Sequence, residues 1–162
     1  MQSQLEKDFL TGTVVLLNQP RNMCLKEIKF NELKSSDIAV DINYSGVSTG
    51  TERLLYQGDM PFFPGMGYPL VPGYESVGTV TFVNDKDSCF KVGDTVFVPG
   101  AKCFGEIKGL FGGAASNLVV SSSRVSLLPQ NSSENATMLA LAATANHIFS
   151  SSERGKSFFN NY

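Results

Sequence analysis

Hydrophobic and polar residues alternate in several short segments along the first three quarters of the chain. The clearest alternation begins at Asp37, where Ile38, Val40 and Ile42 occupy every second position. A period of two is typical of β-strands with one buried face, so we expect Asp37 on the polar face. Further strands are expected at residues 11–17, 23–30, 71–84, 94–99, 115–120 and 124–128. Their spacing predicts a mainly β fold, a β-barrel with irregular loops.

Two helices are expected as well. A short one spans residues 51–57, with Thr51 as its N-cap and Gly58 as its C-terminal stop. A longer one opens at Ser132 or Ser133 and continues through MLALAATANHIF. Its apolar residues are so continuous that we expect both of its faces to be covered.

The chain is expected to form one domain over residues 1–149, followed by a polar tail at 150–162. The tail is rich in Ser and Asn and shows no hydrophobic period, so we interpret it as a frayed or non-native end. With 162 residues, of which 42% are hydrophobic and 17% charged, the composition is that of a globular domain.

Charge and the length of apolar runs narrow the class of function. The formal net charge is -2 and no Lys/Arg cluster occurs, so no nucleic-acid partner is expected. The longest apolar runs are too short for a transmembrane segment, and the first residues lack the apolar core of a signal peptide. A cytoplasmic location is therefore expected. The three cysteines are widely spaced, which predicts neither a disulfide framework nor a cysteine-rich zinc site.

Four motifs, in a fixed order, resemble a known catalytic domain. They are DIAVDINYSGVS, PLVPGYESVGTV, FKVGDTV and GGAASNLVV, and together they resemble the GroES-like domain of medium-chain dehydrogenases/reductases. The resemblance implies a partly open β-barrel with a short helix after the third strand and a C-terminal helix. Longer stretches, from STGTERLLYQG to LALAATANH, resemble dehydrogenases of bacteriochlorophyll biosynthesis over roughly residues 10–149.

That resemblance implies an NAD-dependent alcohol dehydrogenase that oxidises the 3-(1-hydroxyethyl) group of a bacteriochlorophyllide to a 3-acetyl group. The partner is then a chlorin or bacteriochlorin substrate, and the full-length enzyme is expected as a possible homodimer. Two other functions stay open. One is a tetrapyrrole-binding module without chemistry, and the other is a different zinc-free medium-chain reductase such as a quinone reductase.

The nucleotide-binding unit of these enzymes is not expected in these residues. A dinucleotide site needs a Gly-x-Gly-x-x-Gly turn between a strand and a helix, and no such motif occurs. The nearest glycine pair, Gly65 and Gly67, lacks the third glycine and is followed by Pro69. We therefore expect the Rossmann domain to be absent, the NAD site to be incomplete, and the chain alone to be inactive.

The resemblance places the zinc ligands of related alcohol dehydrogenases at Ser48, at Tyr74 and near Ala140. Zinc in proteins binds thiolate, imidazole or carboxylate groups, and none of these three residues carries one. Glu75 is retained next to Tyr74, but a single carboxylate does not hold the ion. The sequence therefore predicts an enzyme that works without zinc.

Catalytic roles are expected for Ser48, Thr51, Tyr74, Glu75 and His147. Tyr74 either donates a hydrogen bond to the substrate oxygen or fills the space that the metal leaves. His147, the only histidine, is either a proton relay or a residue at a helix end or core edge. The hydroxyl groups of Ser48 and Thr51 either bind substrate or make local backbone bonds.

Cofactor contacts are expected from Thr49, Glu52 and Thr144. The alternative for Glu52 is a surface or interdomain ion pair with Arg53. Substrate contacts are expected from the aromatic, proline-rich loop 58–72, which suits a large flat apolar ligand. The substrate-binding residues are Met60, Phe62, Phe63, Met66 and Tyr68, with Phe111 on the same wall. The alternative is that this loop packs on its own barrel.

Overall fold

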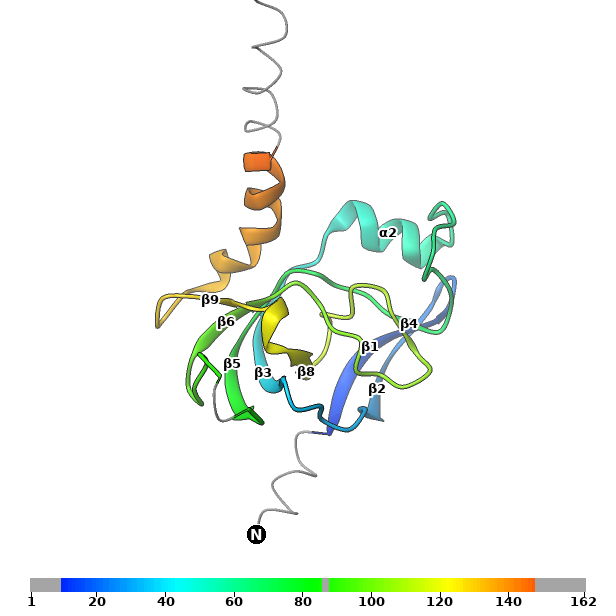
Figure 1. Cartoon of the computed structure of the whole chain (residues 1–162). Coiled ribbons are helices and arrows are strands. Elements are labelled where there is room, and N and C mark those ends of the chain that lie inside the picture. The colour runs from blue at the N-terminus through cyan, green and yellow to red at the C-terminus, as the bar shows by residue number, and fades with distance from the viewer. Residues whose placement is uncertain (1–9, 86–87, 148–162) are drawn as a thin grey trace, which may run out of the picture.

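The structure, a computed structural model, describes residues 10–85 and 88–147 (Figure 1). Its strands are β1 (Thr11–Gln19), β2 (Asn22–Lys29), β3 (Asp37–Ser45), β4 (Leu70–Val71), β5 (Ser76–Val83), β6 (Thr95–Val98), β7 (Lys108–Gly109), β8 (Asn117–Ser121) and β9 (Ser126–Leu127). Its helical elements are α2 (Thr49–Gln57), the 3-10 helices η1 (Ser122–Arg124) and η2 (Glu134–Met138), and an α-helix at 139–147. The fold is mainly β, as predicted, and the predicted tail at 150–162 lies outside the described residues.

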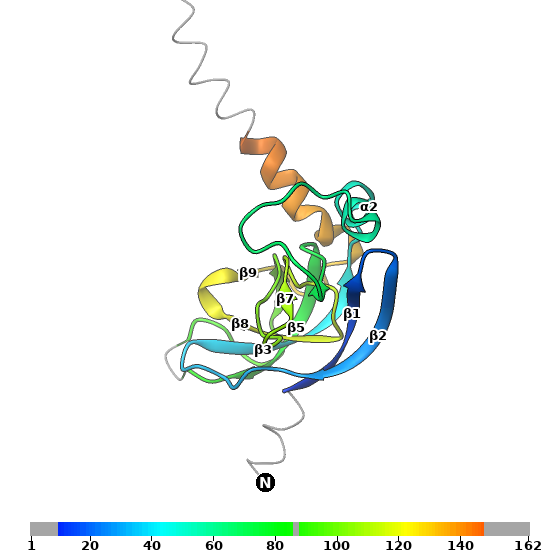
Figure 2. The same ribbon diagram turned by 90° about the vertical axis from the view of Figure 1, so that its right-hand side faces the viewer.

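The strands form two sheets, with the orders β2-β1-β4-β7 and β8-β3-β5-β6-β9. In the second sheet β3 pairs antiparallel with β5 and β8, and in the first β1 pairs antiparallel with β2. Main-chain contacts join the sheets where Val14 bridges Ala115 and the Val15 N–H donates to the Ala114 carbonyl at 2.9 Å. The described strands therefore form a partly open barrel and not a closed one (Figure 2).

The main core draws buried side chains from both sheets, among them Leu16 of β1 and Val40 of β3. The expected alternation of β3 holds only in part, because Asp37 and Ala39 are buried as well. Asp37 is 8% exposed, and its carboxylate accepts a hydrogen bond from the Lys34 N–H at 2.9 Å. Placing Asp37 on a polar face was wrong, since both faces of the first half of β3 are covered.

Helix α2 follows β3, as the resemblance implied, but it begins earlier than expected. Ser48 is its N-cap and Thr49 its first residue, so the prediction of Thr51 as N-cap was wrong. The Ser48 side chain makes no capping hydrogen bond. The predicted end at Gly58 is confirmed, since this glycine has φ 82° and its N–H donates to the Leu54 carbonyl at 3.0 Å. A positive φ at this position is typical of glycine after a helix.

Two expected strands are shorter than predicted. The segment 71–84 contains the end of β4, the whole of β5, and a turn between them. The segment 124–128 is reduced to β9, because η1 ends at Arg124. The interruption between β4 and β5 bears on function, because the turn at this point carries Tyr74 and Glu75.

The predicted C-terminal helix is confirmed in its position but not in its surroundings. The Ser133 hydroxyl accepts a hydrogen bond from the Asn135 N–H at 3.4 Å at the start of η2, which contacts β3 and β5. From there the helix at 139–147 extends away from the sheets (Figure 1, Figure 2). Leu141 is 44% exposed, and residues 142–147 are exposed as well. Within the described residues, the expectation that both faces of this helix are covered was therefore wrong. No helix of this described part is both long and apolar enough to cross a bilayer.

Candidate functional site

The turn between β4 and β5 is held against the loop between β7 and β8. Gly73 has φ 94°, and a Cβ atom there would lie 2.8 Å from the Ala114 nitrogen. The Gly113 N–H donates to the Gly73 carbonyl at 2.7 Å, and the Ala114 N–H donates to the Pro72 carbonyl at 2.9 Å. This close approach of two backbones requires a glycine. It fixes the position of the next residue, Tyr74.

Tyr74 is half-buried, and its ring meets the ring of Phe111 edge-on. The ring centroids are 5.0 Å apart and the planes are inclined by 67°. Such edge-to-face pairs are the favoured arrangement of aromatic rings. The structure thus brings together two residues that the sequence had assigned to the catalytic centre and to the substrate wall.

The carboxyl groups of two acidic residues, Glu75 and Glu52, lie near each other at the first turn of α2. Glu75 is 5% exposed, and its carbonyl accepts a hydrogen bond from the Gly46 N–H at 2.7 Å. A Cβ atom on Gly46 would lie 2.4 Å from Glu75 Oε2, so the backbone packs directly on this carboxylate. Within the described residues, Glu75 Oε1 and Glu52 Oε2 are buried without a hydrogen-bond partner.

The environment of Glu52 favours its protonated form. Burial raises the pKa of the Glu52 carboxyl above its ordinary value, and the charge of Glu75 adds to that effect. Backbone hydrogen bonds at Glu52 and Ser48 oppose the shift. Among the described residues no ion pair joins Glu52 to Arg53, so the expected alternative of such a pair is not formed.

The start of α2 carries the hydroxyl groups that the sequence singled out. The Ser48 carbonyl accepts a hydrogen bond from the Glu52 N–H at 2.9 Å, and the Ser48 side chain is half-buried. Thr49 is exposed at the first position of the helix, whereas Thr51 is half-buried. Ser48 and Glu52 therefore share one helical turn, with Glu75 close enough to act on Glu52 electrostatically.

An apolar cavity of about 780 Å³ lies between the β1–β2 hairpin and α2. Its apolar walls include Val15, Leu17, Met23, Leu25, Val47 and Tyr56. Thr49, Glu52 and Arg53 supply its polar edge. The sequence analysis did not predict this cavity. Met23 and Leu25 are apolar residues two positions apart on β2, a strand that is largely exposed, and this pair was a signal for an apolar surface there.

The aromatic loop 58–72 packs largely on its own barrel. Four of its expected substrate residues lie against a buried cluster of leucines: Met60, Phe63, Met66 and Tyr68. The Tyr68 hydroxyl donates to the Leu55 carbonyl, which ties the loop to α2. Phe62, by contrast, is 86% exposed. The packing fits the alternative that most of this loop is structural.

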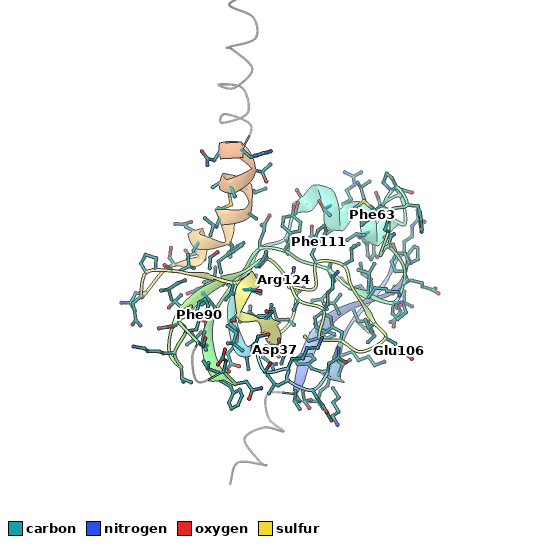
Figure 3. The ribbon with its side chains drawn as sticks, viewed as in Figure 1. Asp37, Phe63, Phe90, Glu106, Phe111 and Arg124 are labelled. Atoms are coloured by element: carbon teal, nitrogen blue, oxygen red, sulfur yellow. The ribbon has the colours of Figure 1, made fainter. Side chains whose placement is uncertain are left out.

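A second cavity, of about 510 Å³, lies beside Phe111 and is lined by basic side chains. Lys102, Lys108 and Arg124 contribute to its wall, together with a single acidic residue, Glu106. Figure 3 shows Phe111, Arg124 and Glu106. We call this space the basic cavity. No local sequence pattern predicts this cavity, because its cations come from segments that are separate along the chain.

Thr144 and His147 lie on the exposed part of the helix at 139–147. The Thr144 hydroxyl donates to the Ala140 carbonyl at 3.0 Å, a bond within its own helix. Within the described residues, no hydrogen bond joins either side chain to Ser48, Tyr74 or Glu75. Their expected roles at the site stay predictions.

The zinc-ligand positions of the family do not fit a metal here. Ser48 and Tyr74 offer hydroxyl groups, and Ala140 offers no donor atom. Across residues 10–85 and 88–147, no three His, Cys, Asp or Glu side chains group closely enough to hold an ion. Ser48, Tyr74 and Ala140 therefore supply none of the thiolate, imidazole or carboxylate groups that bind zinc in proteins.

Comparison with known proteins identifies the relatives of this fold. Residues 34–130 match the family described as alcohol dehydrogenase GroES-like domain. The chain is 49% identical over 140 residues to 2-desacetyl-2-hydroxyethyl bacteriochlorophyllide A dehydrogenase of Cereibacter sphaeroides, covering 83% of this chain and 44% of that protein. It is 50% identical over 135 residues to the protein of the same name from Rhodobacter capsulatus, covering 83% of this chain and 43% of that protein.

Solved structures of alcohol dehydrogenases contain a domain with the same fold as this chain. A short chain alcohol dehydrogenase from E. coli CFT073, complexed with the cofactor NADH, superposes with a TM-score of 0.63 at 20% identity. The match covers 80% of this chain and 42% of that one. The chain therefore spans less than half the length of the relatives that it matches.

Proposed function

The chain belongs to the family of alcohol dehydrogenase GroES-like domains, and on that premise we propose that it is the substrate-binding domain of a bacteriochlorophyllide dehydrogenase. The reaction is oxidation of a 3-(1-hydroxyethyl) group to a 3-acetyl group, with NAD as the hydride acceptor. The observation that carries the proposal is the 49% identity over 140 residues to a relative named for this substrate. We include a cytoplasmic location and a homodimeric full-length form in the proposal.

The oxidation removes a proton and a hydride from the alcohol, and the protein must assist both transfers. The alcohol oxygen loses a proton to a base, and its carbon loses a hydride to the nicotinamide, so that ketone, NADH and a proton are formed. Positive charge that develops on this carbon is shared with the conjugated macrocycle, which lessens the need for a Lewis acid. A zinc-independent reaction is therefore consistent with Ser48 and Tyr74 at the ligand positions.

We assign the following roles to the residues of the turn and of α2. The Tyr74 phenol donates a hydrogen bond to the substrate oxygen, and the hydroxyl groups of Ser48 and Thr51 complete its polar surroundings. Glu75 or His147 accepts the proton, directly or through water. The nicotinamide supplies the hydride acceptor when it is bound, and Thr49, Glu52 and Thr144 are its proposed contacts.

Phe111 is the substrate-wall residue best supported by packing. It contacts Tyr74, is 41% exposed, and lines the basic cavity. A flat apolar ring stacked on Phe111 brings its substituent to Tyr74. Of the loop residues, Phe62 is the most accessible, and Met60, Phe63, Met66 and Tyr68 support the wall from behind.

Spectroscopic titration tests the binding part of the proposal. Zinc 3-(1-hydroxyethyl)pheophorbide a is added to the purified chain, and its long-wavelength absorbance is followed. We expect a saturable shift with one probe per chain, and a weaker shift for a smaller quinone such as menadione. No shift with the chlorin overturns the proposal, and a preference for the quinone supports the quinone reductase alternative.

A chimera tests the chemical part. Residues 10–147 replace the matching part of the Cereibacter sphaeroides relative, and formation of NADH and of the 3-acetyl product is measured. We expect turnover. A chimera that folds and binds the probe without turnover supports the alternative of a tetrapyrrole-binding module.

A further inference from the structure

We propose that the basic cavity binds the free propionate carboxylate of the chlorin macrocycle, an inference that rests on the proposed function. A bacteriochlorophyllide carries one free propionate in addition to the hydroxyethyl group. The two substituents sit on neighbouring rings of the macrocycle. A site that holds both must therefore place a hydrogen-bond donor and a cationic recess on either side of an aromatic wall.

The charges of the basic cavity suit an anion. Lys102, Lys108 and Arg124 line it, and Glu106 is the only acidic residue among its lining groups. No ion pair within the described residues engages any of the three cations. All three residues are exposed, so their charged ends are accessible to a ligand. A carboxylate that meets two such groups gains charge-assisted hydrogen bonds.

The cations are held by three separate elements. Lys108 lies in β7, which pairs in parallel with β4, and its N–H donates to the Pro69 carbonyl at 3.0 Å. The stem of Lys108 passes 3.9 Å from the position that a Cβ on Gly67 would occupy. Arg124 is the last residue of η1, and Lys102 lies in the loop after β6. The cavity is thus a product of the fold and not of one charged segment.

Phe111 connects the basic cavity to the proposed reaction centre. Its ring lines the cavity and meets the Tyr74 ring with centroids 5.0 Å apart. A macrocycle lying on Phe111 therefore has Tyr74 at one edge and the cations at another. The hydroxyethyl and propionate groups likewise lie at different edges of the macrocycle, on neighbouring rings.

The other cavities suit an anion less well. The apolar cavity has a single cation, Arg53, and a single acid, Glu52, among its lining residues, and the rest of its wall is mostly apolar. A cavity of about 380 Å³ shares Lys102 and Arg124 with the basic cavity and adds Lys34, but two acidic residues, Asp37 and Glu32, line it as well. Lys108 belongs to the basic cavity and to neither of the other two. It is therefore the most selective position for a test.

The experiment compares two probes on the full chain. One is zinc 3-(1-hydroxyethyl)pheophorbide a with its free propionate, and the other is the methyl ester of that propionate. We expect the wild-type chain to bind the free acid about five- to tenfold more tightly than the ester. Raising the salt to about 1 M, where the Debye length is about 3 Å, should reduce this ratio.

Single substitutions test which cations recognise the carboxylate. Lys108→Met and Arg124→Met should each lower the ratio of free acid to ester affinity by about two- to fivefold and leave ester binding unchanged. Unchanged ester binding also shows that the variants are folded. Lys91→Met is the matched control, because Lys91 is exposed and lines none of these cavities, and it should keep the wild-type ratio.

The outcomes separate the two proposals. Equal binding of acid and ester by the wild type overturns the propionate site and leaves the proposed function standing. A ratio that persists in both Lys108→Met and Arg124→Met also overturns it, since the carboxylate is then recognised elsewhere. Absence of binding for both probes overturns the proposed function and this inference with it.

Discussion

The ring of Tyr74 packs edge-on against the ring of Phe111, with centroids 5.0 Å apart and planes inclined by 67°. Tyr74 stands at the position where the family's metal-binding histidine is expected. Within the described residues its hydroxyl has no hydrogen-bond partner. The ring is therefore fixed by packing, while the phenol remains available to a ligand.

Tyr74→Phe separates these two properties. The variant keeps the ring contact with Phe111 and removes only the hydroxyl group. We expect affinity for the zinc 3-(1-hydroxyethyl) chlorin to fall about three- to tenfold, the value of one hydrogen bond. Affinity for a 3-ethyl analogue, which has no oxygen at this place, should be unchanged. Both are measured by absorbance titration.

Tyr44→Phe serves as the control for that experiment, since Tyr44 is 43% exposed on β3 and lines none of the described cavities. An equal loss for both chlorins in Tyr74→Phe would mean that the phenol acts only by filling space.

Gly73 and Gly65 form a matched pair for testing the turn. Their φ angles are 94° and 93°, so alanine is strained to a similar extent at both. A Cβ atom at Gly73 would lie 2.8 Å from the Ala114 nitrogen, whereas nothing lies within 4 Å at Gly65. We expect Gly65→Ala to cost about 1 kcal/mol of unfolding free energy and Gly73→Ala about 2–4 kcal/mol. Urea denaturation measures both, and equal losses contradict the close approach of the two backbones.

Cys103 should react far more slowly with thiol reagents than the other two cysteines. Burial is the main cause that raises its pKa to about 11, so its thiol is neutral at pH 8. Cys24 and Cys89 are exposed. We expect two fast thiols per folded chain with a disulfide reagent, and the third only in denaturant. Cys103→Ala should keep both fast thiols, and three fast thiols in the wild type would contradict the burial.

Much of the fold could be predicted because its signals are local. The period of two in β3 and the glycine at the end of α2 depend on neighbouring residues only, and both predictions hold in the main. The order of motifs around Tyr74 identified the family for the same reason. By contrast, the burial of Asp37 depends on which strands cover β3, and no local pattern records that.

In the candidate site, too, the features with a local sequence signal were predicted and those that depend on the packing of distant segments were not. Tyr74 and Glu75 could be proposed from the sequence because they sit in a recognisable turn. The cations of the basic cavity were missed because Lys102, Lys108 and Arg124 meet only through the packing of β7 and η1. The roles expected for all of these site residues, Tyr74 and Glu75 included, remain predictions.

Removal of metal should leave the protein unchanged. Ser48 and Tyr74 offer no thiolate or imidazole, and Ala140 has no donor atom. We expect purified protein to hold less than one zinc per ten chains by mass spectrometry. Dialysis against EDTA should alter neither Tm nor chlorin affinity. A full equivalent of zinc whose removal lowers Tm would refute the proposed zinc independence.

The Glu52 carboxyl should make the fold less stable as pH rises. Burial first, and then the charge of Glu75, raise its pKa above the value of 4.5 that it has in an unfolded chain. The folded protein thus holds this proton more tightly than the unfolded one. The resulting stabilisation is complete below pH 4.5 and is lost as pH rises through the raised pKa.

Glu52→Gln removes the buried charge and should therefore flatten this dependence. At pH 7 we expect the variant to have a Tm roughly 1–3 °C above the wild type, with the difference vanishing toward pH 4. Thermal unfolding followed by circular dichroism between pH 4 and pH 8 measures it. Glu27→Gln on exposed β2 is the matched control and should retain the wild-type slope. If Glu52→Gln keeps that slope as well, the carboxyl is already satisfied in the folded protein by a partner such as water, and the unpaired oxygen beside Glu75 has no energetic consequence.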